Sequence, residues 1–213
     1  VEMEIKNIIR RFIPKFLFDR YKEWETKQEY RRWLDAGKPI PPATAVKRLA
    51  IREYQKKSGY AVLVETGTYK GDMVYTQMNY FREIYSIELA EYYYTRAVKR
   101  FKKYPQVHLF HGDSAKILKT VLNKIKEPVV FWLDGHYSGG MTAKGEEECP
   151  IWGELDVIFP ISYPHVLLID DARCFTGKDG YPTLDELKSY LNKQSVSYTF
   201  AVENDIVRVC LEK

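Results

Sequence analysis

Short apolar runs alternate with longer amphipathic segments from Tyr60 onward. The apolar runs predict five strands, at 60–66, 84–89, 107–112, 128–134 and 166–170. Between them, apolar residues recur at helical spacing and predict helices at about 71–82, 91–104, 114–126 and 146–160. Because strands that alternate with helices form parallel sheets with crossover helices, we expect an α/β domain here.

The pattern changes after the fifth strand. A helix is predicted at Leu184–Asn192, and two more strands at 197–203 and 206–211. Asn204 and Asp205 separate these two strands, and both residue types are frequent in two-residue hairpin turns. The last two strands are therefore expected to form an antiparallel hairpin.

The first 58 residues have another pattern. An apolar stripe at helical spacing is interleaved with basic residues and consists of Ile5, Ile8, Ile9, Phe12, Ile13, Phe16 and Leu17. Pro14 should kink or end the first turns, and a looser helical pattern continues beyond it. The GKPIPP stretch at 37–42 cannot be helical, and a second helix is predicted at 44–57. We expect a helical extension over 1–58 and an α/β domain over 59–213.

Composition and charge narrow the class of protein. Of the 213 residues, 45% are hydrophobic and 29% charged, which excludes a disordered chain. Residues 1–58 carry 15 Lys and Arg against 8 Asp and Glu, whereas residues 59–213 carry 18 against 21. The longest apolar run, Val129–Leu133, is too short to cross a membrane. Three scattered cysteines and no apparent secretory leader favour a reducing, cytoplasmic location.

Polar groups follow all five predicted parallel strands. They are Glu65-Thr66-Gly67, Glu88, Gly112-Asp113-Ser114, Asp134-Gly135-His136 and Asp170-Asp171. Ligands of open α/β sheets bind outside the carboxyl ends of the strands. These groups are therefore the candidate site.

The loop after the first strand reads ETGTYKG. Gly67 permits a sharp turn and the close approach of a ligand, and Gly71 permits close packing where the next helix begins. Glu88 follows Gly67 by 21 residues, where nucleotide-binding folds place an acidic residue against ribose hydroxyls. Asp113 or Ser114 has an equally good alternative role as the cap of the following helix.

From Tyr60 to the C-terminus these features resemble the class I S-adenosylmethionine-dependent methyltransferases. The E-x-G-x-x-x-G loop, the acidic end of strand two, the Gly-Asp after strand three and the closing hairpin occur in that order. The resemblance implies a doubly wound, Rossmann-like sheet of seven strands in the order 3-2-1-4-5-7-6, with the last strand antiparallel. Its implied S-adenosylmethionine-binding residues are Glu65, Thr66, Gly67, Thr68, Gly71, Glu88, Asp113, Ser114 and Asp134. One departure is the single glycine at Gly67, where many members have two.

Two further segments, LDGHYSGG and LLIDDAR, are similar to the branch with macrolide-sugar O-methyltransferases and cephalosporin hydroxylase-like proteins. That resemblance implies that Asp134, Asp170 and Asp171 bind a divalent cation, for which Mg²⁺ is the natural choice. Three carboxylates at adjacent strand ends also repel one another unless a cation joins them. The alternative is that Asp170 caps its strand or pairs with Arg173, while Asp171 faces water.

His136 stands two residues after Asp134, so both side chains point the same way if strand geometry persists. Transfer of a methyl group to a hydroxyl requires that the hydroxyl lose its proton, and His136, Asp134 or Asp171 is a candidate acceptor. The alternative for His136 is a loop histidine that is hydrogen-bonded to the backbone.

These residues favour S-adenosylmethionine-dependent methylation of a hydroxyl on a sugar or other small molecule, assisted by a divalent cation. One rival is an NAD(P)-dependent oxidoreductase, against which stand the absence of G-x-G-x-x-G and the terminal hairpin. Another rival is a nucleotide-binding regulatory protein without catalysis. The polar cluster at Asp134, His136, Asp170 and Asp171 argues against it, because a protein that only binds a nucleotide does not need so many charges close together. An oxygenase-like activity lacks a convincing iron-binding triad.

The basic N-terminal region has three interpretations. It is an interfacial helix on anionic lipid, a docking or homodimerisation arm, or a cover over the α/β domain. We favour the arm or the cover, because Trp24, Trp33 and the apolar stripe require burial. Nucleic acid is a weaker alternative, because the basic residues match no recognised binding module.

Overall fold

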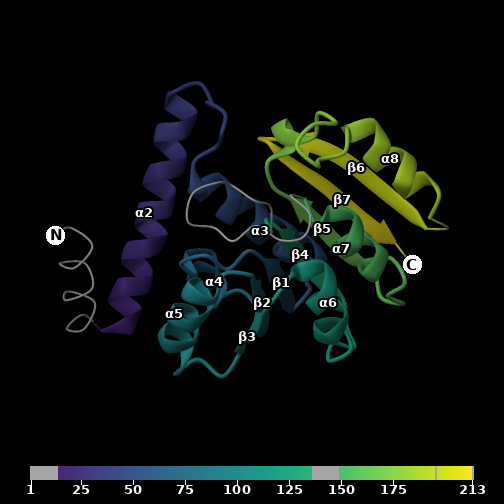
Figure 1. The fold of residues 1–213 in the computed structure, drawn as a ribbon. Helices are drawn as coiled ribbons and strands as arrows, with labels where there is room; N and C mark the ends of the chain where they lie inside the picture. The colour runs from purple at the N-terminus through teal and green to yellow at the C-terminus, as the bar shows by residue number, and fades with distance from the viewer. Residues whose placement is uncertain (1–13, 136–148, 195, 213) are drawn as a thin grey trace.

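The computed structural model describes residues 14–135, 149–194 and 196–212. Its centre is one seven-stranded sheet with the order β3-β2-β1-β4-β5-β7-β6, as predicted (Figure 1). The strands are β1 (Val62–Thr66), β2 (Glu83–Glu88), β3 (Val107–His111), β4 (Val129–Leu133), β5 (His165–Ile169), β6 (Ser197–Glu203) and β7 (Ile206–Glu212). Strands β1 to β5 are parallel, and β7 runs antiparallel to both β5 and β6.

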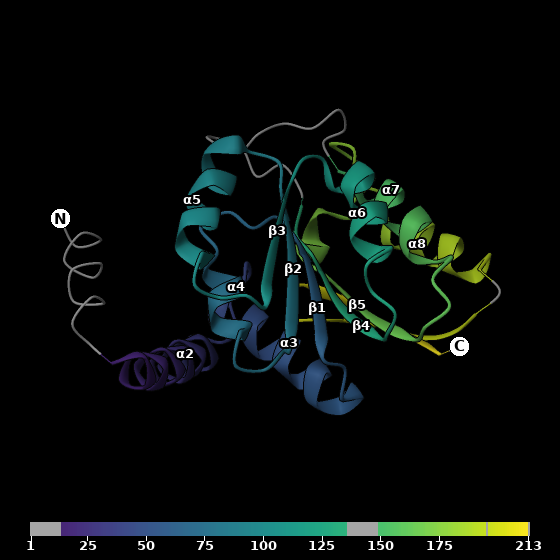
Figure 2. The ribbon, with the colours of Figure 1, turned by 90° about the horizontal axis from the view of Figure 1, so that it is seen from below.

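Helices cover both faces of the sheet (Figure 2). They are α2 (Lys15–Asp35), α3 (Thr44–Ser58), α4 (Asp72–Gln77), α5 (Glu91–Phe101), α6 (Ser114–Leu122), α7 (Ile151–Ile158) and α8 (Leu184–Asn192), with a 3-10 turn η1 at Ala172–Cys174. Successive strand residues point to opposite faces, so Val64 packs on the side of α6, α7 and α8, while Leu63 packs on the side of α3, α4 and α5. The central strands are fully buried because both faces are covered.

All four helices predicted between the parallel strands are shorter in the structure, and those expected at 91–104 and 114–126 end at Phe101 and Leu122. The helix expected at 71–82 ends at Gln77, and hydrogen-bonded turns to the Gln77 carbonyl follow it. The helix expected at 146–160 is described from Ile151 to Ile158, and it starts directly after Pro150, which lacks the amide donor of a helix interior. The hairpin turn is confirmed: Asn204 and Asp205 have φ of 54° and 65°, as a two-residue turn with positive φ requires.

The N-terminal helices pack on the α/β domain to different extents. Helix α3 buries Ala50 and Ile51 in the core, whereas α2 begins directly after Pro14 and lies along the outside, against α3. Trp33 is buried and its indole N–H donates to the Pro39 carbonyl at 2.9 Å. Trp24 is 57% exposed, so the expectation that it would be buried is wrong. Residues 1–13, with most of the predicted apolar stripe, lie outside the described residues.

No helix in the described ranges is both long enough and apolar enough to cross a lipid bilayer.

Candidate functional site

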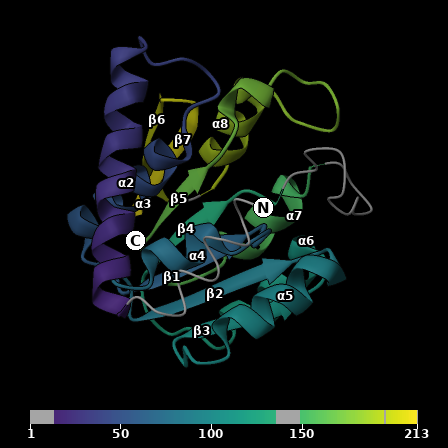
Figure 3. The same ribbon diagram turned by 90° about the vertical axis from the view of Figure 1, so that its left-hand side faces the viewer.

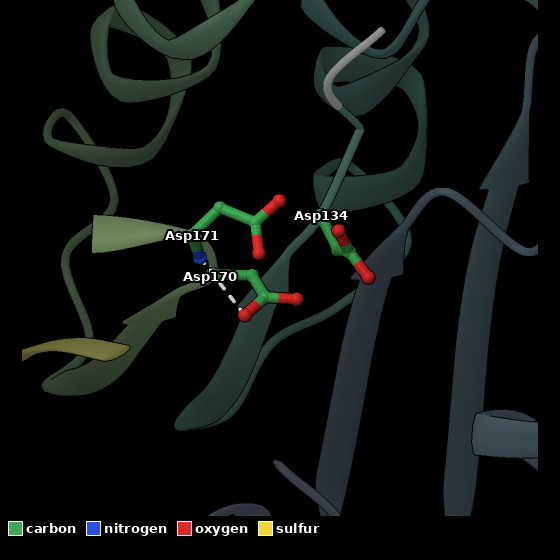
Figure 4. Close-up of side chains that lie close together, drawn as sticks. All are labelled: Asp134, Asp170 and Asp171. Carbon is green, nitrogen blue, oxygen red and sulfur yellow. Dashed lines mark hydrogen bonds between the residues drawn. The ribbon is translucent and has the colours of Figure 1, made fainter. Parts of the chain in front are cut away.

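Three aspartates meet at the carboxyl ends of β4 and β5, as the strand pattern predicts. Leu133 of β4 pairs in parallel register with Ile169 of β5, so the residues that follow them emerge side by side. Asp134, Asp170 and Asp171 each bring one carboxylate oxygen to within 4.8 Å of the others (Figure 4). The sheet register therefore produces the cluster, since neither strand end alone would hold all three groups.

The backbone turns sharply at the acidic pair. Asp171 has a φ of 56°, and its amide donates to Oδ1 of Asp170 at 2.9 Å. The Arg173 guanidinium lies 2.9 Å from Oδ1 of Asp171 and also pairs with Asp205. The alternative in which Asp170 pairs with Arg173 is therefore wrong, because Arg173 pairs with Asp171 and Asp205.

Lys47 supplies a positive charge that was not predicted. It comes from α3, and its Nζ forms an ion pair with Oδ2 of Asp170 and lies 3.5 Å from Oδ1 of Asp171. Lys47 precedes Asp170 by 123 residues, so only packing of α3 on the sheet brings the two together. Sequence reasoning missed it because a lysine on an amphipathic helix usually faces water.

Burial and charge shift the pKa values of Asp170, Asp134 and Lys47. Burial raises the pKa of Asp170 to about 6, even though the Lys47 ammonium acts in the opposite direction. Burial, together with the charge of Asp170, raises the pKa of Asp134 well above its ordinary value. Burial alone would lower the pKa of Lys47, but the charges of Asp170 and Asp134 outweigh it and raise that pKa. The cluster therefore favours the charged form of Lys47 and the protonated forms of Asp134 and Asp170.

A second polar group lies at the end of β1. Glu65 is fully buried, and the Ser86 hydroxyl of β2 donates to its Oε2 at 2.6 Å. The Thr68 hydroxyl oxygen lies 2.5 Å from the same Ser86 oxygen. Burial raises the pKa of Glu65 to about 8, and the hydrogen bond from Ser86 offsets only part of this effect. Glu65 is therefore a neutral acid at pH 7.

Gly67 brings the two polar groups into contact. Its φ is +88°, and a Cβ at this position would lie 2.4 Å from the Asp134 carbonyl oxygen. The Asp134 amide also donates to the Thr66 hydroxyl at 3.2 Å. Gly71, in contrast, would direct a Cβ to 2.6 Å from the Phe101 ring. Gly67 thus allows β1 and β4 to meet at the site, whereas Gly71 allows α4 to pack on α5.

Glu88 and Asp113 both bind backbone amides. The Glu88 carboxylate accepts from the Tyr69 amide at 2.6 Å and from the Ala90 amide at 2.8 Å, and so joins the loops after β1 and β2. Asp113 is the N-cap of α6 and accepts from the Ala115 amide at 3.0 Å. Of the two roles considered for Asp113, the capping role is the one that its contacts display.

Glu154 is a buried acid that sequence reasoning missed. It lies on α7, has no exposed surface, and neither carboxylate oxygen meets normal hydrogen-bond geometry with a described residue. Burial raises its pKa to about 7, while the nearby hydroxyls of Ser114 and Thr66 act against the increase. Its helical spacing from Ile151 and Ile158 places it on the core face, which is the one signal in the sequence.

His136, the candidate proton acceptor, lies outside the described residues. The remaining predicted site residues occupy one edge of the sheet, except Gly71, which packs behind it. Two unpredicted residues, Lys47 and Glu154, join them.

No model of a protein family matches the sequence, and no curated protein matches it. Solved structures do match. An O-methyltransferase from Bacillus cereus in complex with SAH superimposes with a TM-score of 0.57 at 14% identity, covering 98% of this chain and 96% of that one. The SAH-bound methyltransferase PaMTH1 from Podospora anserina gives 0.56 at 15%, covering 100% and 95%.

The N-methyltransferase NodS from Bradyrhizobium japonicum WM9 gives a TM-score of 0.53 at 13% identity, covering 78% of this chain and 95% of that one. Oxygen and nitrogen methyltransferases thus occur among the similar structures, so the likeness does not distinguish the methyl acceptor. The chain has the Rossmann-like fold of class I methyltransferases.

Proposed function

We propose that this protein transfers a methyl group from S-adenosylmethionine to a hydroxyl of a sugar or other small molecule, with a divalent cation bound beside the acceptor. The observation that carries the proposal is the contact between two polar groups at one sheet edge. The Glu65 loop reaches the Asp134 carbonyl through Gly67, and the aspartate cluster continues from there. A nucleoside site and a cation site side by side are what such a reaction requires.

The residues at the end of β1 fit the methyl donor. In our proposal Glu65, Thr66, Gly67 and Thr68 shape the pocket for the methionine part. Glu88 binds the ribose hydroxyls with the acceptor capacity that its two amide contacts leave unused, since each carboxylate oxygen has two lone pairs. Asp113 and Ser114 face the adenine, and Gly71 supports the loop from behind.

The donor set of the cluster fits a hard divalent cation such as Mg²⁺. All three proposed ligands, Asp134, Asp170 and Asp171, offer carboxylate oxygen. Lys47 contributes one positive charge against three ionised carboxylates, which leaves a charge of minus two for the ion to balance. Such an ion lowers the pKa of a hydroxyl bound to it.

The proposed proton acceptors are His136, Asp134 and Asp171. Arg173 and Lys47 occupy the Asp171 carboxylate. No hydrogen bond or ion pair to a described residue involves the Asp134 carboxylate, and burial together with the charge of Asp170 raises its pKa, which favours uptake of a proton. Of the two aspartates, Asp134 is therefore our preferred proton acceptor.

The test is calorimetry on the full chain followed by a transfer assay. S-adenosylhomocysteine should bind and NADH should not, and radioactive methyl from S-adenosylmethionine should reach hydroxylated acceptors in a panel of sugars and phenols. Addition of EDTA should stop transfer without abolishing nucleoside binding. NADH binding in place of S-adenosylhomocysteine would reject the proposal, and EDTA-insensitive transfer would reject its metal part.

A further inference from the structure

Helix α2 has an outward face that nothing in the described structure covers. Five large apolar side chains are exposed on this helix: Phe16 at 63%, Leu17 at 46%, Tyr21 at 47%, Trp24 at 57% and Leu34 at 38%. Figure 3 shows α2 running along the outside of the molecule. Monomeric proteins seldom expose so many large apolar groups on one element without a binding role.

Three of the five acidic residues of α2 turn away from this face, while Glu25 accepts a hydrogen bond from the Tyr21 hydroxyl at 3.4 Å. Asp19 accepts from the Tyr75 hydroxyl at 3.0 Å, Glu23 pairs with Arg52 at 2.7 Å, and Glu29 lies 3.8 Å from Arg48. Glu25 pairs with Lys22 along the helix at 2.6 Å. Contacts with the body of the protein thus occupy three of the five acidic side chains. Only one of the five, Asp35 at the last position of the helix, is exposed.

Basic residues of α2 remain on the outside. Arg20, Lys27 and Arg31 are exposed, and none of them forms an ion pair with a described residue. Their spacing of seven and four residues places them on one side of the helix, together with Leu17, Tyr21 and Trp24. We call these six residues the outer face. It extends over about 20 Å, at the rise of an α-helix.

We propose that the outer face of α2 binds the surface of an anionic membrane, with the helix lying parallel to the lipid plane. Lys and Arg attract acidic headgroups, while Trp and Tyr rings prefer the boundary between headgroups and acyl chains. A two-fold dimer through the same face would bring two sets of unpaired cations together, which disfavours a second copy as the occupant. A nucleic acid would leave Leu17 without a suitable contact. This inference does not depend on methyl transfer.

The experiment is sedimentation of the full chain with vesicles of phosphatidylcholine, alone or mixed with phosphatidylserine. We expect binding to the mixed vesicles, weakened by salt, and little binding to phosphatidylcholine. The variant R20E/K27E/R31E should lose about a hundredfold in partitioning, and W24S about tenfold. The matched control K99E/K102E/K103E makes the same charge change at exposed lysines of α5 and its C-terminal end, and should bind nearly as wild type.

Tryptophan fluorescence supplies a second measurement. Trp24 is exposed, whereas Trp33 and Trp132 are buried, so emission should shift to the blue on vesicle binding and W24F should lose that shift. Equal loss in the two triple variants would overturn the proposal, as would equal binding to both vesicle types. Tighter binding to single-stranded RNA than to mixed vesicles, or a wild-type dimer that the α2 variant converts to monomer, would also overturn it.

Discussion

Carboxylates at the ends of β1 and β5 lie at the same edge of the sheet and are stabilised in different ways. Glu65, at the end of β1, accepts from Ser86 and has a pKa raised by burial to about 8, so it carries a proton at neutral pH. Asp170 and Asp171, at the end of β5, receive the ammonium of Lys47 instead. The first group offers hydrogen bonds without charge, while the second keeps excess negative charge. The same functional group, a carboxyl, thus suits a neutral hydrogen-bonding contact at the end of β1 and a cation at the end of β5.

Asp170→Asn should have the largest effect, because it removes one carboxylate charge from the cluster at the end of β5. The variant leaves the Lys47 ammonium without its main partner, which should lower the free energy of unfolding by about 3 kcal/mol. Loss of one proposed ligand should lower methyl transfer by about a hundredfold. Urea unfolding and the transfer assay measure the two effects. Asp179→Asn makes the same change at an exposed loop residue and should alter neither, so equal behaviour of the two variants would contradict the role of Asp170.

Glu65→Gln should change how the stability of the protein depends on pH. The pKa of Glu65 is raised from 4.5 to about 8, so the folded state binds a proton that the unfolded state releases between these values. Its stabilising effect is complete below pH 4.5 and is lost as pH rises toward about 8, with a slope of at most about 1.4 kcal/mol per pH unit. Glu154 acts in the same direction, so the observable is the difference in slope between wild type and Glu65→Gln. Unfolding measured at several pH values should show that the stability of the variant depends less on pH than that of wild type. An unchanged slope would contradict the raised pKa of Glu65. Glu91→Gln, at an exposed glutamate, is the control.

Gly67→Ala should push the loop after β1 away from Asp134 at the end of β4. The new Cβ would meet the Asp134 carbonyl oxygen at 2.4 Å, in addition to the cost of a φ of +88° for alanine. Gly37→Ala is a matched control, since Gly37 has a φ of +81° and no atom within 4 Å of the new Cβ. The difference between the two variants in free energy of unfolding should be about 2 kcal/mol in excess of the shared backbone cost. Calorimetry should also show weaker S-adenosylhomocysteine binding for Gly67→Ala alone. Equal stability of the two variants would mean that the contact between β1 and β4 is unimportant.

Lys47→Met should have the smallest effect. It removes the ammonium while keeping much of the aliphatic stem, and the raised pKa values of Asp134 and Asp170 let protons replace part of the lost charge. We expect a loss of about 1–2 kcal/mol, or about 4 °C in Tm. Mn²⁺ should then raise Tm more in the variant than in wild type, because no ammonium competes for Asp170. Lys56→Met, at an exposed position of the same helix, should show neither change. An identical Mn²⁺ response in all three proteins would exclude competition between Lys47 and a metal ion.

Elements with strong local patterns were predictable. The apolar runs of β1, β4 and β5 and the Asn204-Asp205 turn are visible in the sequence because burial on both faces and positive φ demand particular residue types. The end of α4 was not predictable, since the residues after Gln77 still suit a helix and only tertiary packing turns the chain there.

The residues of the site also differ in whether they could be predicted from the sequence. Asp134, Asp170 and Asp171 were identifiable because each directly follows a buried parallel strand, and sheet geometry brings such positions together. Lys47 and Glu154 were not, because their helices reach the site only through packing. Trp24 was misjudged because periodicity identifies a stripe of a helix without saying whether anything covers it.

The order of strands and helices along the chain, the acidic strand ends and the closing hairpin could be predicted from the amino-acid sequence, since these features follow from local burial and turn chemistry. Tertiary structure alone decided which charges face one another. It turned three of the five acids of α2 toward the body of the protein and left Arg20, Lys27 and Arg31 outside, and it placed the Lys47 ammonium among the aspartates. Electrostatic pairing depends on distances between segments far apart in the chain, and no local pattern encodes those distances.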